Sequence, residues 1–212
     1  MTPIYKNLYQ FTTYIPPMNF TIHQYLLRSD PAILFATGTI HDARNNLSSI
    51  KELLGKQKLA YIFVSHMESD ECGGLSVFQK EYPEVQVICS ALGARELPGY
   101  GYSGRIVAAG AGEKIVEGDL SLHILDYPSE VHLQNGIVAY EEHSGIFYSS
   151  DLMFALGNAG GQIHDEAWNV LVNGVDEGRI PNEEMRKQLQ KNLLAISPEF
   201  VAVGHGFCVR CI

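Results

Sequence analysis

The chain has 212 residues, of which 46% are hydrophobic and 18% charged, and its formal net charge is −9. This composition is that of a globular protein and excludes a disordered chain, and an acidic chain without a Lys/Arg run is a poor candidate for binding nucleic acid or an anionic membrane. Four cysteines do not indicate a disulfide scaffold in a chain this long, no apolar run has membrane-spanning length, and no secretion signal precedes Phe20, so a cytoplasmic protein is expected.

Strands and helices alternate in the first half of the chain. Apolar runs predict strands at 32–36, 59–65 and 85–89, and helical patterns that end at Gly55 and before Pro83 predict helices at 50–54 and 75–81. Because helices and strands alternate, an all-α fold is excluded.

The second half begins with alternating strand patterns between residues 106 and 125, with glycines at the turns. Further predicted elements are a hairpin over 136–149 with its turn at 142–145, a helix over 181–195 with an apolar face of Met185, Leu189 and Leu193, and a strand over 200–203. These patterns predict an α/β protein with a single domain over residues 1–212, but they do not choose among α/β sandwiches.

The strongest local signal is the segment Phe63-Val64-Ser65-His66-Met67-Glu68-Ser69-Asp70-Glu71-Cys72-Gly73-Gly74. A strand is expected to end at His66, and four potential metal ligands follow within a few residues: His66, Glu68, Asp70 and Glu71. The first three alternate, so an extended loop would point them the same way, and the two glycines would let the backbone turn into the next helix. The alternative is a polar loop whose acidic residues cap that helix.

Three further candidates lie at the ends of predicted strands, where sites on α/β scaffolds collect. His132 precedes the hairpin, Asp151 follows its second strand, and His205 ends the last strand between Gly204 and Gly206. Each of these residues is a weak signal by itself, and it is their order along the chain that carries weight.

That order, His-x-Glu-x-Asp followed by His, Asp and His, resembles the metallo-β-lactamase superfamily and implies a four-layer αβ/βα sandwich. Most hydrolases of the superfamily carry His where this chain has Glu68, and the glutamate is similar to the flavodiiron proteins and the related oxygen-binding di-iron proteins. The spacing from His132 to Asp151, and Tyr140 between them, agree with that branch.

The resemblance implies a ligand set for two iron ions. His66, Glu68 and His132 would bind the first ion, Asp70 and His205 the second, and Asp151 would bridge them. Glu71 stands where the family usually has a histidine, so that it either binds a metal through oxygen or turns away and leaves a water there. The sequence stops at Ile212, so we expect neither a flavodoxin domain nor a flavin site, and reduction would then need an external electron donor.

The donor set also bears on the chemistry. Replacing imidazoles by carboxylates favours iron or manganese over zinc, and the added negative charge raises the pKa of a bridging water, which disfavours hydrolysis. The sequence therefore favours a protein that binds, senses or reduces dioxygen or nitric oxide, with an electron-donor or signalling protein as partner and a homodimer left open. The alternatives are a dinuclear zinc or iron hydrolase of an ester, lactone, thioester or phosphodiester that uses a bridging hydroxide, and a module with structural metals only.

Two more features have weaker support. Cys208 and Cys211 form a C-x-x-C just after His205, which would be a redox pair or a soft metal site, although a zinc site would need two more ligands. His164 follows a glycine-rich loop, residues 157–161, which lacks the lysine of a phosphate loop; the histidine either lines the site or lies apart from it.

Overall fold

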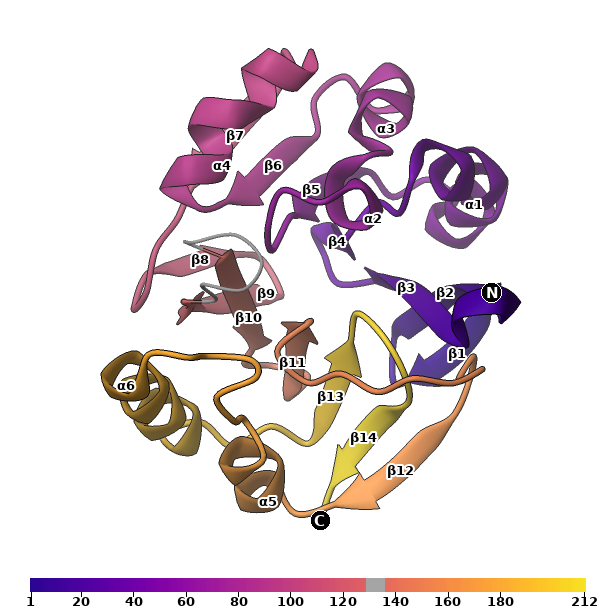
Figure 1. The fold of residues 1–212 in the computed structure, drawn as a ribbon. Helices are drawn as coiled ribbons and strands as arrows, with labels where there is room; N and C mark the ends of the chain where they lie inside the picture. The colour runs from indigo at the N-terminus through magenta and orange to yellow at the C-terminus, as the bar shows by residue number, and fades with distance from the viewer. Residues whose placement is uncertain (129–135) are drawn as a thin grey trace.

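The computed structural model describes residues 1–128 and 136–212, and within them the chain forms two seven-stranded sheets (Figure 1). The first sheet has the order β1-β2-β3-β4-β5-β6-β7 and contains β1 (Thr2–Tyr5), β2 (Leu8–Ile15), β3 (Phe20–Leu27), β4 (Ala32–Phe35), β5 (Leu59–Phe63), β6 (Gln86–Cys89) and β7 (Arg105–Ala108). The second has the order β12-β14-β13-β11-β10-β9-β8 and contains β8 (Lys114–Glu117), β9 (Leu120–Tyr127), β10 (Gly136–Glu141), β11 (Ile146–Ser150), β12 (Ile163–Glu166), β13 (Phe200–Val203) and β14 (Cys208–Cys211).

Helices accompany each sheet. They are α1 (Ile40–Leu54), α2 (Ser69–Cys72), α3 (Leu75–Glu81), α4 (Ala91–Glu96), α5 (Trp168–Asn173) and α6 (Glu183–Leu194), with short 3-10 turns η1 (Pro16–Met18) and η2 (Leu97–Tyr100). In Figure 1, α1, α3 and α4 lie with the first sheet, and α5 and α6 lie with the second. No helix in the described part of the chain is long and apolar enough to cross a bilayer.

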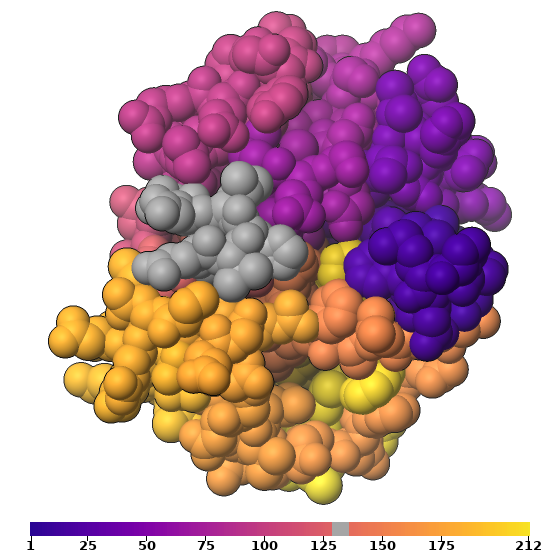
Figure 2. Space-filling model, in the orientation of Figure 1, coloured from indigo at the N-terminus to yellow at the C-terminus, as the bar shows by residue number. Residues whose placement is uncertain are grey.

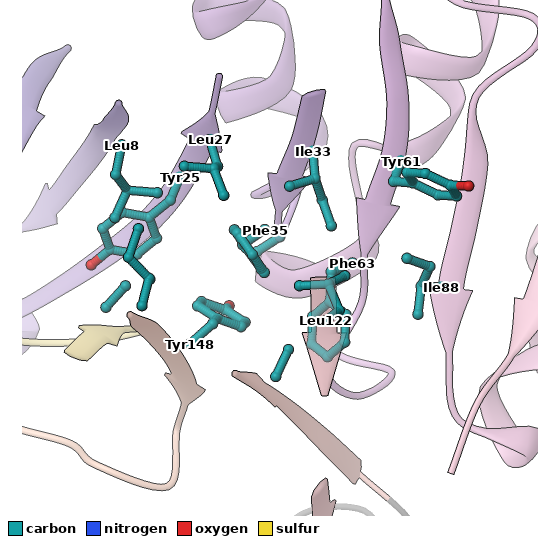
Figure 3. Packing of buried hydrophobic residues seen from close by; sticks show 14 of the residues in the cluster. Leu8, Tyr25, Leu27, Ile33, Phe35, Tyr61, Phe63, Ile88, Leu122 and Tyr148 are labelled. Carbon is teal, nitrogen blue, oxygen red and sulfur yellow. The ribbon is translucent and has the colours of Figure 1, made fainter. Parts of the chain in front are cut away.

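The strands alternate their side chains between three hydrophobic layers. In the first sheet Phe35 and Phe63 enter the core between the sheets, whereas Leu34 and Ile62 face the layer under α1 and α3. Figure 3 shows Phe35 and Phe63 beside Tyr148, which reaches the same core from β11. A third layer packs the outer face of the second sheet against α5 and α6. These layers confirm the predicted αβ/βα sandwich, while a single domain over residues 1–212 stays a prediction.

Most predicted elements are present with small shifts. The hairpin is confirmed, because β10 pairs antiparallel with β11 across residues 142–145. The helix predicted at 50–54 is the end of a longer one that begins at the N-cap Thr39, where Thr39 and Asp42 form a capping box. The apolar face expected for α6 is wrong at Met185, which is 45% exposed because only Leu189 and Leu193 reach the third layer.

The N-terminal strands β1 to β3 were not predicted individually, and they connect the two halves of the chain. Thr21 in β3 donates from its hydroxyl to the carbonyl of Gly157 over 2.8 Å, and the amide of Gly157 donates to the carbonyl of Asn19 over 2.7 Å. Figure 2 shows the indigo N-terminal surface meeting the orange segment that follows Asp151.

The ends of three strands bring the candidate residues to one edge. β11 and β13 pair in parallel, so Asp151 and His205 leave the second sheet at the same end. His66 follows β5 of the first sheet, and the carbonyl of Ser65 accepts a bond of 3.0 Å from the amide of Ile137 in β10. The loop after β5 therefore lies against the second sheet at this edge.

Candidate metal centre

The carboxylate of Asp151 lies between two histidine rings. Its Oδ1 is 3.0 Å from Nε2 of His205, and its Oδ2 is 3.6 Å from Nε2 of His66. A second carboxylate accompanies each ring: Oε2 of Glu68 is 3.7 Å from Nε2 of His66, and Oδ2 of Asp70 is 3.4 Å from Nε2 of His205. One oxygen of Asp151 thus belongs to each of two histidine–carboxylate groups.

The centre of this arrangement is buried and its rim is open to water. The side chains of His66, Asp151 and His205 are at most 5% exposed, whereas that of Glu68 is 38% exposed and that of Asp70 17%. Water therefore reaches the carboxylates at the rim more readily than the two rings.

The crowding of acids and rings shifts their protonation. Burial alone would lower the pKa of His66. The pairing with Glu68 and the negative charges of Glu71 and Asp151 outweigh burial and raise that pKa to about 9. The pKa of His205 is likewise raised, with burial opposed and outweighed by Asp151 and Asp70. Without metals, the carboxylates thus favour the protonated form of both rings, and metal binding competes with protons for their nitrogens.

The loop after β5 is shorter and more helical than the sequence suggested. The strand ends at Phe63 rather than His66, and Glu68, the N-cap of α2, is extended, whereas Asp70 lies inside the helical turn. The prediction of an extended loop is therefore wrong beyond Glu68, because the tightening of α2 sends Asp70 toward His205 and leaves Glu68 beside His66. The capping alternative does not describe Glu68, whose side chain makes no cap bond.

The glycines on both sides of His205 stand where an added Cβ atom would crowd neighbouring atoms. A side chain at Gly204 would place its Cβ 3.1 Å from Oδ1 of Asp151. Gly206 has φ +94°, and a Cβ there would lie 2.7 Å from both Cβ and the carbonyl oxygen of Ala155. The Gly-His-Gly sequence thus lets the chain after β13 pass close to Asp151 and Ala155.

Both rings are fixed at their other nitrogen, so that Nε2 faces the carboxylates. Nδ1 of His205 donates to the carbonyl of Thr21 over 2.8 Å. Nδ1 of His66 lies 3.4 Å from the hydroxyls of both Ser150 and Ser65. Such bonds orient metal-binding histidines in proteins.

Glu71 is as deeply buried as Asp151, and its carboxylate contacts protein donors. Oε1 accepts from the hydroxyls of Tyr148 at 2.8 Å and Ser150 at 2.9 Å, and Oε2 accepts from the amide of Ser65 at 3.3 Å. Burial raises the pKa of Glu71, against the positive charge of His66, which lowers it. Tyr148 and Ser150 have no motif in the sequence that marks them as site residues. The only signal is their alternation on the strand that leads into Asp151.

One predicted ligand cannot be placed. His132 lies in residues 129–135, outside the described residues, so its relation to the other candidates stays a prediction.

The remaining candidates lie away from the carboxylates. Cys208 and Cys211 are both in β14, where Cys208 faces the core between the sheets and Cys211 packs against the outer layer, so they do not form a thiol pair. The ring of His164 is exposed and stacks on Phe207 at 3.7 Å. Tyr140 donates to a backbone carbonyl at the outer layer.

Aromatic rings cover the His205 side. The rings of Phe20 and Phe154 lie 4.3 and 5.5 Å from that of His205, and the guanidinium of Arg179 lies 4.4 Å from the centre of Phe154. His205, Phe154 and Arg179 also border a pocket of ≈380 Å³. Aromatic rings therefore flank His205 on this side, and the Arg179 guanidinium lies beyond them against Phe154.

Comparison with known proteins places the chain in a family. A family model described as ODP family beta lactamase matches residues 20–206, which is most of the chain. The chain belongs to the ODP family. Among curated proteins, a member of the diflavin flavoproteins, diflavin flavoprotein A 2 of Nostoc sp. strain PCC 7120, is 26% identical over 136 residues, which are 62% of this chain and 23% of that protein.

Solved structures show the same fold. The rubredoxin oxygen:oxidoreductase of Desulfovibrio gigas is 18% identical to this chain, with a TM-score of 0.82. The match covers 99% of this chain and 57% of the Desulfovibrio protein. The flavodiiron core of Flv1 from Synechocystis sp. PCC6803, a metal-soaked structure, matches 96% of this chain and 54% of its own, with 18% identity and a TM-score of 0.75. With the family match, these confirm the resemblance to the flavodiiron branch of the metallo-β-lactamase superfamily. The chain spans little more than half the length of these two proteins.

The donor atoms of this ODP-family chain fit metal ions. One atom each from His66, Glu68 and Asp151 lies within 4.8 Å of the others, and His205 with Asp70 forms a second group on the other oxygen of Asp151. Buried carboxylates are stable only with compensating charge, and imidazole nitrogens beside carboxylate oxygens are ligands that iron, manganese and zinc accept.

Proposed function

We propose that this chain is a cytoplasmic non-haem di-iron protein that binds, senses or reduces dioxygen or nitric oxide. The observation that carries the proposal is the position of Asp151, whose two oxygens face two separate histidine–carboxylate groups. A bridging carboxylate needs this disposition, since each oxygen can then serve a different ion.

Each ion would have its own ligands from this chain. His66, Glu68 and, from outside the described residues, His132 would hold the first ion, and Asp70 and His205 the second, with Asp151 shared. Ferrous ions bound there would supply the electrons and the ligand positions with which dioxygen or nitric oxide reacts.

The protein residues prepare the site for such chemistry in three ways. Three carboxylates stabilise iron over zinc and favour its oxidised form. The bonds from Nδ1 of His205 and His66 fix the rings, so that Nε2 is available. Phe20 and Phe154 limit water beside His205, and an apolar flank suits a small neutral gas.

A structural relative also supports oxygen chemistry at such a site. The printed name of the Desulfovibrio protein describes an oxygen oxidoreductase that uses rubredoxin, and the structural likeness covers nearly all of this chain. Electrons for reduction would come from a donor protein in trans, and a sensor would instead have a signalling partner; both are part of the proposal.

The test is an optical spectrum of anaerobically purified protein loaded with two ferrous ions per chain, recorded before and after adding dioxygen. We expect a new visible charge-transfer band in the parent protein and its loss in Glu68→Ala. The matched control is Glu84→Ala, because Glu84 is an exposed glutamate in the loop before β6.

Two other results would contradict the di-iron proposal. A protein that keeps two zinc ions per chain, shows no band with iron and dioxygen, and turns over an ester or phosphodiester would be the dinuclear hydrolase. Two retained metals with neither oxygen reactivity nor hydrolysis would indicate a structural role for them.

A further inference from the structure

The carboxylate of Glu71 is occupied by protein donors on both oxygens. Tyr148 and Ser150 donate to Oε1 over 2.8 and 2.9 Å, and the amide of Ser65 donates to Oε2 over 3.3 Å. Glu71 itself is 4% exposed. Three donors meet most of what a carboxylate can accept, so little capacity is left for a metal ion.

The Ser150 hydroxyl connects this carboxylate to a candidate ligand. Because the hydroxyl donates its proton to Glu71, its lone pairs remain for the ring of His66, whose Nδ1 is 3.4 Å away. The contact is long for a hydrogen bond, but its direction is defined: Nδ1–H donates to Ser150, and Nε2 then faces Glu68 and Asp151.

The backbone holds Ser150 in place for this contact. Ser150 has φ +46°, a left-handed conformation that is uncommon for residues other than glycine. Its carbonyl accepts the amide of Gly204 over 2.9 Å, which ties the end of β11 to the loop that carries His205. The same short segment therefore positions Asp151, directly after it, and the hydroxyl between Glu71 and His66.

We propose that Glu71 is a positioning residue that orients His66 through Ser150 and does not itself bind a metal ion. Where the family usually has a histidine ligand, this chain has exchanged a metal contact for a carboxylate–serine–histidine chain of hydrogen bonds. The second metal would then have Asp70, His205 and Asp151 as its ligands from the described residues, and its remaining positions would be open to small ligands. The inference rests on the proposed function only in assuming that metals bind here.

Cobalt(II) titration of the metal-free protein tests this without any oxygen chemistry. Cobalt absorption in the visible reports the coordination of the ion, and competition with a chelator gives its affinity. The variants are Glu71→Gln, Ser150→Ala and the double variant. Ser149→Ala is the matched control, because Ser149 is a buried serine of the same strand whose hydroxyl donates to the Ser150 carbonyl over 3.3 Å.

We expect Glu71→Gln and Ser150→Ala each to weaken binding of one cobalt ion by about 10-fold to 100-fold, as loss of a histidine's orienting partner does elsewhere. At saturation both should still bind two ions with the parent's absorption spectrum. The double variant should be no weaker than the weaker single variant, because both changes break one chain of bonds. Ser149→Ala should match the parent.

Direct ligation by Glu71 predicts something different. In that case the saturated spectrum of Glu71→Gln changes in intensity, Ser150→Ala keeps the parent affinity, and the proposal is overturned. If Ser150→Ala does not fold, Ser150→Gly removes the same hydroxyl and suits the left-handed backbone. Two cobalt ions bound in this pattern, with no reaction of the iron form with dioxygen, would leave this inference standing and remove the proposed function.

Discussion

Two histidines of the site each have an orienting contact from a residue that is far away in sequence. His205 is held by the carbonyl of Thr21, and His66 by hydroxyls that include Ser150. The sequence could predict the rings and carboxylates, because a His-x-Glu-x-Asp pattern is local and imidazole beside carboxylate has a clear chemistry. It could not predict which backbone carbonyl or serine fixes each ring, since those contacts arise only when the two sheets pack.

At the same scale, Gly206→Ala should damage both stability and metal binding. A Cβ at φ +94° is strained, and it would lie 2.7 Å from Cβ and the carbonyl oxygen of Ala155. We expect the free energy of unfolding to fall by about 2–4 kcal/mol, and the affinity for cobalt to fall because the displaced loop carries His205. Urea unfolding and cobalt titration measure the two effects.

Gly110→Ala is the control for that variant, because a Cβ at Gly110 meets no atom within 4 Å. It should leave both quantities within error of the parent. Equal behaviour of the two variants would mean that the loop after β13 adapts freely and that Gly206 has no special role.

At the scale of elements, the turn from α2 into α3 was predicted correctly, but its glycines have a different role from the one expected. The sequence predicts a helix over 75–81, and the structure has α3 at those residues. Gly73 and Gly74 were expected to supply backbone freedom, yet both have negative φ. The glycine at 74 is needed for space instead, because a Cβ there would lie 2.4 Å from Cβ of Ala43 in α1.

Gly74→Ala should therefore separate α1 from α3. Ala43 is fully buried, and the carbonyl of Thr37 also lies 3.1 Å from the added Cβ, so neither neighbour can move without disturbing the layer over the first sheet. We expect a loss of about 1–3 kcal/mol of unfolding free energy in urea. Gly99→Ala, where an added Cβ has open space, should change the unfolding free energy by less than about 0.5 kcal/mol. A Gly74→Ala protein as stable as the parent would show that this helix contact is loose.

Across the whole molecule, the sequence gives the order of the elements much better than their packing partners. Strands with continuous apolar runs, such as β5 and β13, are readily predicted because both faces are buried. The N-terminal strand β3 is not, since it carries Thr21, His23 and Gln24 among its buried residues. Their polarity hides a core strand in the sequence.

The structure explains that polarity by bonds between the two halves of the chain. Thr21 donates to Gly157, Tyr25 donates to Val203, and the ring of His23 bonds to the carbonyl of Gly206 over 2.7 Å. Each of these three partners lies in the second half, so Thr21, Tyr25 and His23 gain these bonds only when both sheets are assembled. Gln24 differs, because its side-chain oxygen accepts from Asn46 in α1 over 3.1 Å. The candidate site, which draws residues from both halves, depends on the same assembly.

His23 gives this dependence a measurable pH signature. Its Nε2–H donates to Gly206 and its Nδ1 accepts from Thr12 over 2.9 Å, so both ring nitrogens of the neutral imidazole have a partner. Burial lowers the pKa of His23 to about 4. The charge of His205 lowers it too, whereas the bond to Gly206 partly opposes the shift. In the unfolded chain the ring binds a proton below about 6.5.

Between these two values the unfolded state holds more protons than the folded state, so stability must rise with pH. The protein should accordingly lose stability as the pH falls from about 6.5 to about 4, by roughly 3 kcal/mol over the whole interval and about 2 kcal/mol at pH 5. We expect His23→Gln, whose amide can donate to Gly206 and accept from Thr12, to lack this loss. The measurement is urea unfolding of both proteins with metals removed, at several pH values from 8 to 5. His66 and His205 titrate in both, so the difference between the two curves isolates His23. Curves that stay parallel over this range would mean that the folded protein accepts a proton at His23, and that β3 is held to the second sheet by its other bonds.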